Sequence, residues 1–188
     1  VGLVTANGMN GLYYVPGIAN GHYVSLRRIH VNKDVMVFWT TFDNNGKITG
    51  PAAWKGPDIA ADPAWLYHFT PDDIAVLDAA LATLKARGRA FPRFGAQDFP
   101  IAPLVPRLTA FADELENGRG FKLLRGLPVE RYSDAEINAI TYGIGLHLGQ
   151  PVCQNPRGDL LGEVMNVGDI HDKNTRVYQT NLYLPYHS

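Results

Sequence analysis

The last residues of the chain carry its clearest chemical signal, a single histidine placed just after a predicted strand. Residues 177–184 are rich in β-branched and aromatic side chains, which favours an extended strand, and His187 follows Pro185. A strand end holds a side chain rigidly, as a metal ligand requires. If an aspartate followed Ser188, the result would be a His-x-Asp pair, two of the three ligands of the facial triad that binds non-haem Fe(II). The sequence predicts His187 as an iron ligand; a surface or satisfied core histidine is the structural alternative.

The other histidines do not form a recognisable metal motif. None pairs with another at a spacing of four residues, and the metalloprotease pattern His-Glu-x-x-His is absent. A cysteine-based zinc site is also excluded, because Cys153 is the only cysteine. We expect Cys153 to be a small buried apolar residue, His147 to lie in the core and His171 to lie in a solvated loop.

Phosphate-binding and nucleophile motifs are also missing. The sequences Gly118-Arg119-Gly120 and Gly143-Ile144-Gly145 lack the full glycine-rich fingerprints, and no Gly-x-Ser-x-Gly elbow occurs. Gly143 and Gly145 are better explained as close-packing positions in a helix, and Ser133 as a helix cap. No catalytic residue is predicted apart from the proposed ligand.

Composition limits the class of protein. The 188 residues are 46% hydrophobic and 19% charged with a net charge of −1, which predicts a packed core in one domain, or one domain with a small module. The longest basic run is Arg27-Arg28, which gives no electrostatic case for nucleic acid. No apolar window reaches membrane-spanning length, and no signal peptide is visible, so we expect a cytoplasmic protein without a membrane partner.

The pattern of predicted secondary structure changes near residue 50. Before it, segments 12–15, 22–29 and 35–42 are predicted strands separated by turn signals, which indicates a small antiparallel β meander. After it, helices and strands alternate. Helix starts are predicted at Thr70-Pro71-Asp72-Asp73 and at the capping box Ser133-x-x-Glu136, a further helix is expected around 104–117, and strands are expected at 120–126, 160–167 and 177–184.

Three pieces of the chain resemble the taurine dioxygenase/TfdA-like family of Fe(II)- and 2-oxoglutarate-dependent oxygenases. They are Gly50-Pro51-Ala52-Ala53-Trp54-Lys55-Gly56 with residues 70–80; residues 115–128, including Gly118-Arg119-Gly120-Phe121; and residues 149–162 leading to Tyr178-Gln179-Thr180-Asn181 and Tyr186-His187-Ser188. The resemblance implies an α+β fold, an incomplete double-stranded β-helix (jelly roll) with flanking helices, preceded by the antiparallel β meander.

The same resemblance implies roles for individual residues. His187 matches the first iron ligand, and the remaining ligands, together with an arginine for 2-oxoglutarate, would lie beyond Ser188. We therefore expect residues 50–188 to be the N-terminal part of an oxygenase domain, inactive alone, that uses Fe(II) and 2-oxoglutarate on a small organic substrate. Four residues near the motif are candidates to line the substrate pocket, with ordinary loop hydrogen bonding as the alternative: Gln154, Asn155, Gln179 and Asn181.

Residues 1–49 are interpreted as a separate β extension or fused repeat. Residues 11–48 resemble a bacterial Gly-His-Gly type β-repeat through Gly11-Leu12-Tyr13-Tyr14 and Gly21-His22-Tyr23. This segment supports a second hypothesis, a non-catalytic β-rich binding module. A truncated jelly roll would also leave unpaired strand edges, which would allow a homo-oligomer to form.

Overall fold

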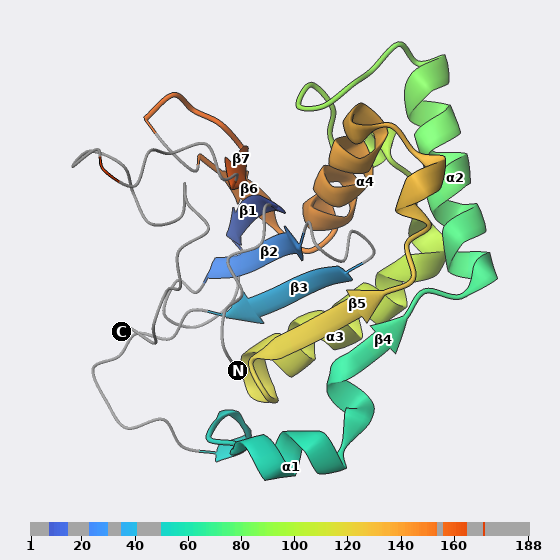
Figure 1. Cartoon of the computed structure of the whole chain (residues 1–188). Coiled ribbons are helices and arrows are strands. Elements are labelled where there is room, and N and C mark those ends of the chain that lie inside the picture. The colour runs from blue at the N-terminus through green and yellow to red at the C-terminus, as the bar shows by residue number, and fades with distance from the viewer. Residues whose placement is uncertain are drawn as a thin grey trace.

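The protein is a mixed structure of helices and strands, in which a layer of helices lies against a single sheet (Figure 1). The computed structural model describes residues 8–14, 23–29, 35–40, 50–153, 156–164 and 171.

The described residues form a seven-stranded sheet in the order β4-β5-β3-β2-β1-β6, and β7 also pairs with β1. Only β4 and β5 run parallel; all other described pairs are antiparallel. The strands are β1 (Gly8–Tyr14), β2 (Tyr23–Ile29), β3 (Val35–Thr40), β4 (Leu66–His68), β5 (Phe121–Arg125), β6 (Gln150–Val152) and β7 (Leu161–Val164).

The antiparallel pairing of β1, β2 and β3 confirms the predicted meander. The meander does not stand apart from the rest of the chain, because β3 pairs with β5, with Trp39 opposite Phe121, and β1 pairs with both β6 and β7. Its three strands therefore form the middle of the sheet. The division of the chain at residue 49 into units of different origin stays a prediction.

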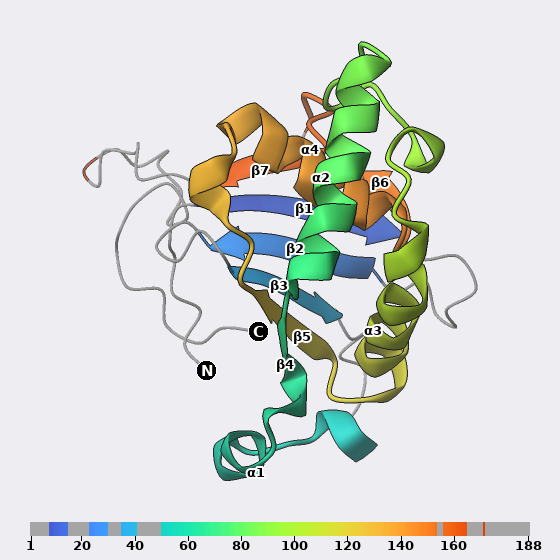
Figure 2. The same ribbon diagram turned by 90° about the vertical axis from the view of Figure 1, so that its right-hand side faces the viewer.

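In the part of the chain that the structure describes, four α-helices accompany the sheet: α1 (Gly56–Ala61), α2 (Pro71–Ala86), α3 (Val105–Asn117) and α4 (Asp134–Leu146). Figure 2 shows α2, α3 and α4 on the same face of the sheet, while α1 lies beyond the edge strand β4. Short 3-10 helices occupy Gly50–Ala52, Pro63–Trp65, Ala96–Asp98, Ala102–Leu104 and Val129–Arg131.

The predicted helix start at Thr70 and the predicted capping box at Ser133 are confirmed, and Thr70 also forms a capping box. The Thr70 hydroxyl accepts a hydrogen bond from the Asp73 backbone N–H at the start of α2, and Ser133 does the same for Glu136 in α4. Each N-cap backbone N–H donates in return to the acidic side chain three residues later. These bonds satisfy amide groups that a helix start otherwise leaves unpaired.

The core lies between the helices and the sheet, and within it Gly143 of α4 packs closely against Phe99. A methyl group at Gly143 would come within 2.4 Å of the Phe99 ring, so only glycine allows α4 to pack this closely. The prediction that Gly143 is a close-packing position is therefore confirmed. The largest fully buried side chains are Phe99, Leu77, Leu84, Ile101, Leu115, Leu124, Leu127 and Ile137.

The predicted jelly roll is not confirmed by the described residues. A jelly roll requires two sheets that face each other, whereas the described strands form one sheet with helices on one face. The predicted last strand, 177–184, lies outside the described residues. No helix in the described part of the chain combines the length and apolar character that a membrane span requires.

Candidate functional site

The five residues predicted to bind metal or substrate all lie outside the part of the chain that the structure describes, so their roles stay predictions. They are Gln154, Asn155, Gln179, Asn181 and His187. Within the described residues, no group of three or more histidine, cysteine, aspartate or glutamate side chains is placed to hold a metal ion. The described residues therefore do not supply the ligand set of an iron centre, and no reaction step is built on one.

The structure does define where the loop that contains Gln154 and Asn155 begins and ends. Strands β6 and β7 pair with neighbouring positions on β1, so Val152 and Leu161, which flank the loop, lie close together on the sheet. Compact loops with adjacent ends frequently carry function. The register at the two ends pairs Val152 with Leu12 and Leu161 with Gly11.

Three described residues of this loop, Cys153, Arg157 and Asp159, are not buried. The prediction that Cys153 is buried is wrong, because its side chain is exposed at the point where the chain leaves β6. Further along, the Arg157 guanidinium donates to the Asp159 carboxylate at 3.0 and 3.2 Å, across the glycine turn between them. The loop thus presents polar groups to solvent on its described side.

The most buried charged group of the described residues is Asp73, at the start of α2. Its carboxylate accepts hydrogen bonds from the Tyr67 hydroxyl at 2.5 Å, the Thr70 backbone N–H at 2.8 Å and the Arg107 guanidinium. Burial alone would raise the pKa of Asp73, but these hydrogen bonds outweigh it and hold the pKa below its usual value. Burial and the adjacent carboxylate raise the pKa of Tyr67 to about 12. These bonds hold the charged Asp73 carboxylate in place. The pKa shifts of Asp73 and Tyr67 both lead away from neutral pH, so neither group is suited to proton transfer there.

A second carboxylate of α2, Asp78, has the same kinds of partners. It accepts from the Tyr132 hydroxyl at 2.7 Å and from the Arg131 guanidinium at 2.9 Å. Burial, together with the neighbouring carboxylate, raises the pKa of the Tyr132 hydroxyl. This network attaches α2 to the segment that precedes α4.

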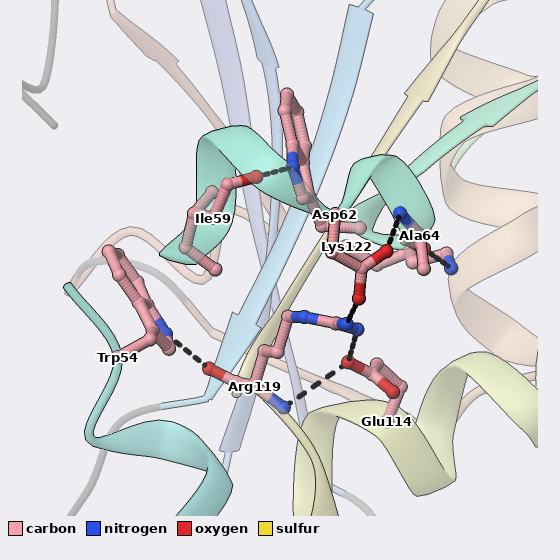
Figure 3. A network of polar contacts seen from close by, with 8 residues as sticks. Trp54, Ile59, Asp62, Ala64, Glu114, Arg119 and Lys122 are labelled. Carbon is pink, nitrogen blue, oxygen red and sulfur yellow. Dashed lines mark hydrogen bonds and ion pairs between the residues drawn. The ribbon is translucent and has the colours of Figure 1, made fainter. Parts of the chain in front are cut away.

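A third polar network, around Arg119, joins α1 and the residues near it to the end of α3 (Figure 3). The Arg119 guanidinium forms ion pairs with Asp62 and Glu114, and its backbone carbonyl accepts the Trp54 indole N–H at 3.0 Å. A groove of about 420 Å³ opens beside these groups. It is lined by Pro51, Trp54, Asp58, Asp62, Glu114, Gly118 and Arg119.

The Arg119 network has a structural role, because it links Asp62 after α1 to Glu114 of α3. Its guanidinium is shared between two carboxylates, while Trp54 and Trp65 both pack on Phe121, with ring centroids 5.2 and 6.0 Å away. Arg119 supplies one positive charge against the two carboxylates of Asp62 and Glu114, so the three side chains together leave one net negative charge beside the groove. The contacts of Trp54 and Trp65 with Phe121 hold residues 50–65 against β5.

The described histidines do not lie together in an arrangement typical of a catalytic site. His147 is half-buried at the end of α4, where its Nε2 hydrogen-bonds the Phe99 carbonyl at 2.8 Å, so the core prediction is correct only in part. His68 and His171 are exposed, as predicted for His171.

Two curated proteins are similar to this chain. FR-33289 synthase from Streptomyces rubellomurinus is 29% identical over 143 residues, which cover 75% of this chain and 42% of that protein. Taurine hydroxylase-like protein SAT17 from Stachybotrys chartarum is 24% identical over 156 residues, which cover 76% of this chain and 39% of that protein. The chain therefore spans about two fifths of the length of the curated relatives it matches.

These similarities suggest an oxygenase-type, taurine hydroxylase-like family at low identity. No protein-family model matches the chain. Neither comparison supports the resemblance of residues 11–48 to a Gly-His-Gly type β-repeat.

The networks around Asp73 and Arg119 are not predicted by the sequence pattern. The sequence pattern places Asp73 only in a helix start, and Arg119 only in an incomplete glycine motif and in a segment that resembles the oxygenases. Their partners are 34 and 57 residues away in the chain, so the networks depend on tertiary structure. The sequence gives only a weak indication of the Arg119 network, namely that Trp54 and Arg119 both lie in the segments that resemble the oxygenases.

Proposed function

We propose that this chain is the N-terminal portion of an Fe(II)- and 2-oxoglutarate-dependent dioxygenase that hydroxylates a small organic substrate. The observation that carries the proposal is similarity over three quarters of the chain to proteins named as a synthase and as a taurine hydroxylase-like protein. The three sequence segments that resemble the oxygenase family also support it.

The proposal assigns the iron site to residues at the C-terminal end of the sequence. His187 would be one ligand, in its neutral form, and a facial triad needs a second imidazole and a carboxylate besides. The described residues do not provide these two, and the relatives' greater length provides room for them further along the chain. Bound Fe(II) would supply oxidation of a substrate C–H bond by O2, coupled to conversion of 2-oxoglutarate to succinate and CO2.

The substrate pocket in this proposal includes the loop 153–160 and the segment before His187. Gln154, Asn155, Gln179 and Asn181 would orient substrate or cosubstrate through amide hydrogen bonds. The pairing of β6 and β7 with adjacent positions of β1 supports the first pair, because it holds both ends of their loop on the sheet. The expected jelly roll would be completed by strands outside the described residues.

The test is iron-dependent turnover in the natural protein that contains this sequence. Succinate formation from 2-oxoglutarate should require Fe(II), and His187→Ala should reduce it by more than the roughly 10–100-fold that loss of an outer-shell partner causes. His68→Ala is the matched control, because His68 is exposed on β4, and it should retain activity. Undiminished turnover in His187→Ala would refute the ligand assignment.

Partners and location remain part of the proposal. We expect a small-molecule substrate, no nucleic acid or membrane partner, a homo-oligomer if strand edges stay open, and a cytoplasmic location. The alternative, a non-catalytic β-rich binding module, gains no specific support, because β1, β2 and β3 are paired into the same sheet as β5 and β6.

A further inference from the structure

A narrow apolar groove lies between α2 and α4, remote in sequence from the proposed iron site. Figures 1 and 2 show the two helices side by side on the covered face of the sheet. The groove has a volume of about 220 Å³ and an almost entirely apolar lining. The apolar lining residues are Leu81, Leu84, Ala90, Phe91, Ala135 and Ala139, and the polar ones are Lys85, Arg89, Glu136 and Asn138.

The charged side chains that line the groove, Lys85, Arg89 and Glu136, sum to one net positive charge. Residues 85–93 contain four cationic side chains and no acid, in a chain whose net charge is −1. Two of the four are neutralised, since Lys85 pairs with Glu136 and Arg87 pairs with Asp98. Among the described residues, Arg89 has no carboxylate within ion-pair distance, although Asp98 lies near enough to interact with it electrostatically, so the excess positive charge that lines the groove is that of Arg89.

The groove is held in shape before any partner arrives. The ion pair between Lys85 of α2 and Glu136 of α4 joins the two helices at the groove's rim. The base is rigid, because Leu81, Leu84 and Ala139 belong to the hydrophobic core. A preformed pocket lowers the ordering cost that binding must overcome.

We propose that this groove docks an acidic segment of a partner protein, which inserts one large apolar side chain between α2 and α4 and places a carboxylate beside Arg89. The volume lies below the roughly 300–1,000 Å³ of small-molecule sites and suits a single anchoring side chain. Charge complementarity selects an acidic segment. Glu136 repels a carboxylate on its own side, so the partner's charge is directed toward Arg89.

The direct test uses the full chain and a fluorescein-labelled peptide, Gly-Asp-Glu-Phe-Glu-Asp-Gly, with binding followed by fluorescence anisotropy. Ala135→Trp should fill the groove from its exposed side, and Arg89→Glu should reverse the charge at the rim. Each should weaken binding at least about tenfold, as should replacement of the peptide's phenylalanine by serine. The matched controls, Ala82→Trp on the exposed part of α2 and Lys55→Glu far from the groove, should change the affinity by less than about twofold.

Circular dichroism verifies that each variant is folded, and Ala135→Leu replaces Ala135→Trp if the larger side chain prevents folding. Equal binding of the phenylalanine and serine peptides would overturn the proposal, because it would show charge attraction without insertion. Wild-type affinity in the groove-filling variant, or no binding at millimolar peptide, would overturn it too. Binding to phosphatidylserine vesicles that Ala135→Trp leaves unchanged, without peptide binding, would instead identify an anionic membrane surface as the ligand.

Discussion

Helix α2 carries two carboxylates, Asp73 and Asp78, that have the same kinds of partners but different surroundings. Each accepts hydrogen bonds from one tyrosine hydroxyl and one arginine. The side chain of Asp73 is 4% exposed and that of Asp78 is 36% exposed. The partners are Tyr67 and Arg107 for the first and Tyr132 and Arg131 for the second.

The difference in burial decides what each network does for the fold. A buried carboxylate that loses a partner cannot recruit water, so its partners are required and their positions become part of the structure. Asp73 consequently holds α2 in a defined place relative to β4 and α3, and it also accepts the Thr70 backbone N–H. Asp78 can exchange its partners for water, so it adds a modest attraction to a contact made by other side chains.

Replacing the two carboxylates by amides should give the largest contrast. Asp73→Asn keeps the volume but puts an N–H₂ group among donors, and it should lower the free energy of unfolding by about 2–4 kcal/mol. Asp78→Asn should cost less than about 1 kcal/mol. Urea unfolding followed by circular dichroism measures both, and the slope with denaturant should stay the same in each variant. Equal losses would mean that burial does not distinguish the two networks.

Local signals in the sequence were enough to predict the helical layer. Thr70 and Ser133 start α2 and α4 through their capping boxes, and apolar periodicity indicated α3. These features depend on residues within four positions of each other. The contact of Gly143 with Phe99 was anticipated only as close packing, because nothing local identifies a partner 44 residues away.

The sheet and the candidate site are harder to predict from local sequence patterns. Strands β4 and β6 were not predicted, because three residues are too few to show an alternating pattern. The meander was predicted from its turns, yet its pairing with β5, β6 and β7 depends on contacts across the whole chain. The site prediction rested on resemblance, and its residues lie outside the described part, so His187 remains to be tested by turnover.

Removing only the tyrosine hydroxyls should rank the two networks in the same order, with smaller losses in the free energy of unfolding. Tyr67→Phe keeps the ring that packs against Phe111 and Arg107 but leaves the buried carboxylate with one fewer donor. The expected loss is about 1–2 kcal/mol in the free energy of unfolding, against less than about 1 kcal/mol for Tyr132→Phe. Thermal unfolding of the two variants in parallel tests this, and a larger loss for Tyr132→Phe would reverse the ranking.

Acid should act on the Asp73 network through its lowered pKa. A carboxyl group with a lower pKa in the folded state than in the unfolded state stabilises the fold above its ordinary pKa, 3.8 for Asp73, and that stabilisation is lost as the pH falls through the folded value. The free energy of unfolding of the wild type should therefore fall below about pH 4. In Asp73→Asn this acid-dependent loss should be smaller, because the titrating group is gone. An unchanged pH profile would show that Asp73 contributes nothing to acid sensitivity.

The smallest effect is expected at the exposed end of α2, where Lys85 pairs with Glu136. Hydrogen bonds from Lys85 and Ser133 lower the pKa of Glu136 to about 2, but the Lys85 side chain is 58% exposed, so solvent screens the pair. A double-mutant cycle with Lys85→Gln and Glu136→Gln should give a coupling below about 1 kcal/mol that nearly vanishes in about 1 M NaCl, where the screening length is about 3 Å. The equivalent cycle for Asp73 and Arg107 should keep most of its coupling in the same salt, because Asp73 is buried. If salt removed both couplings equally, the two ends of α2 would have to be treated as electrostatically equivalent despite their difference in burial.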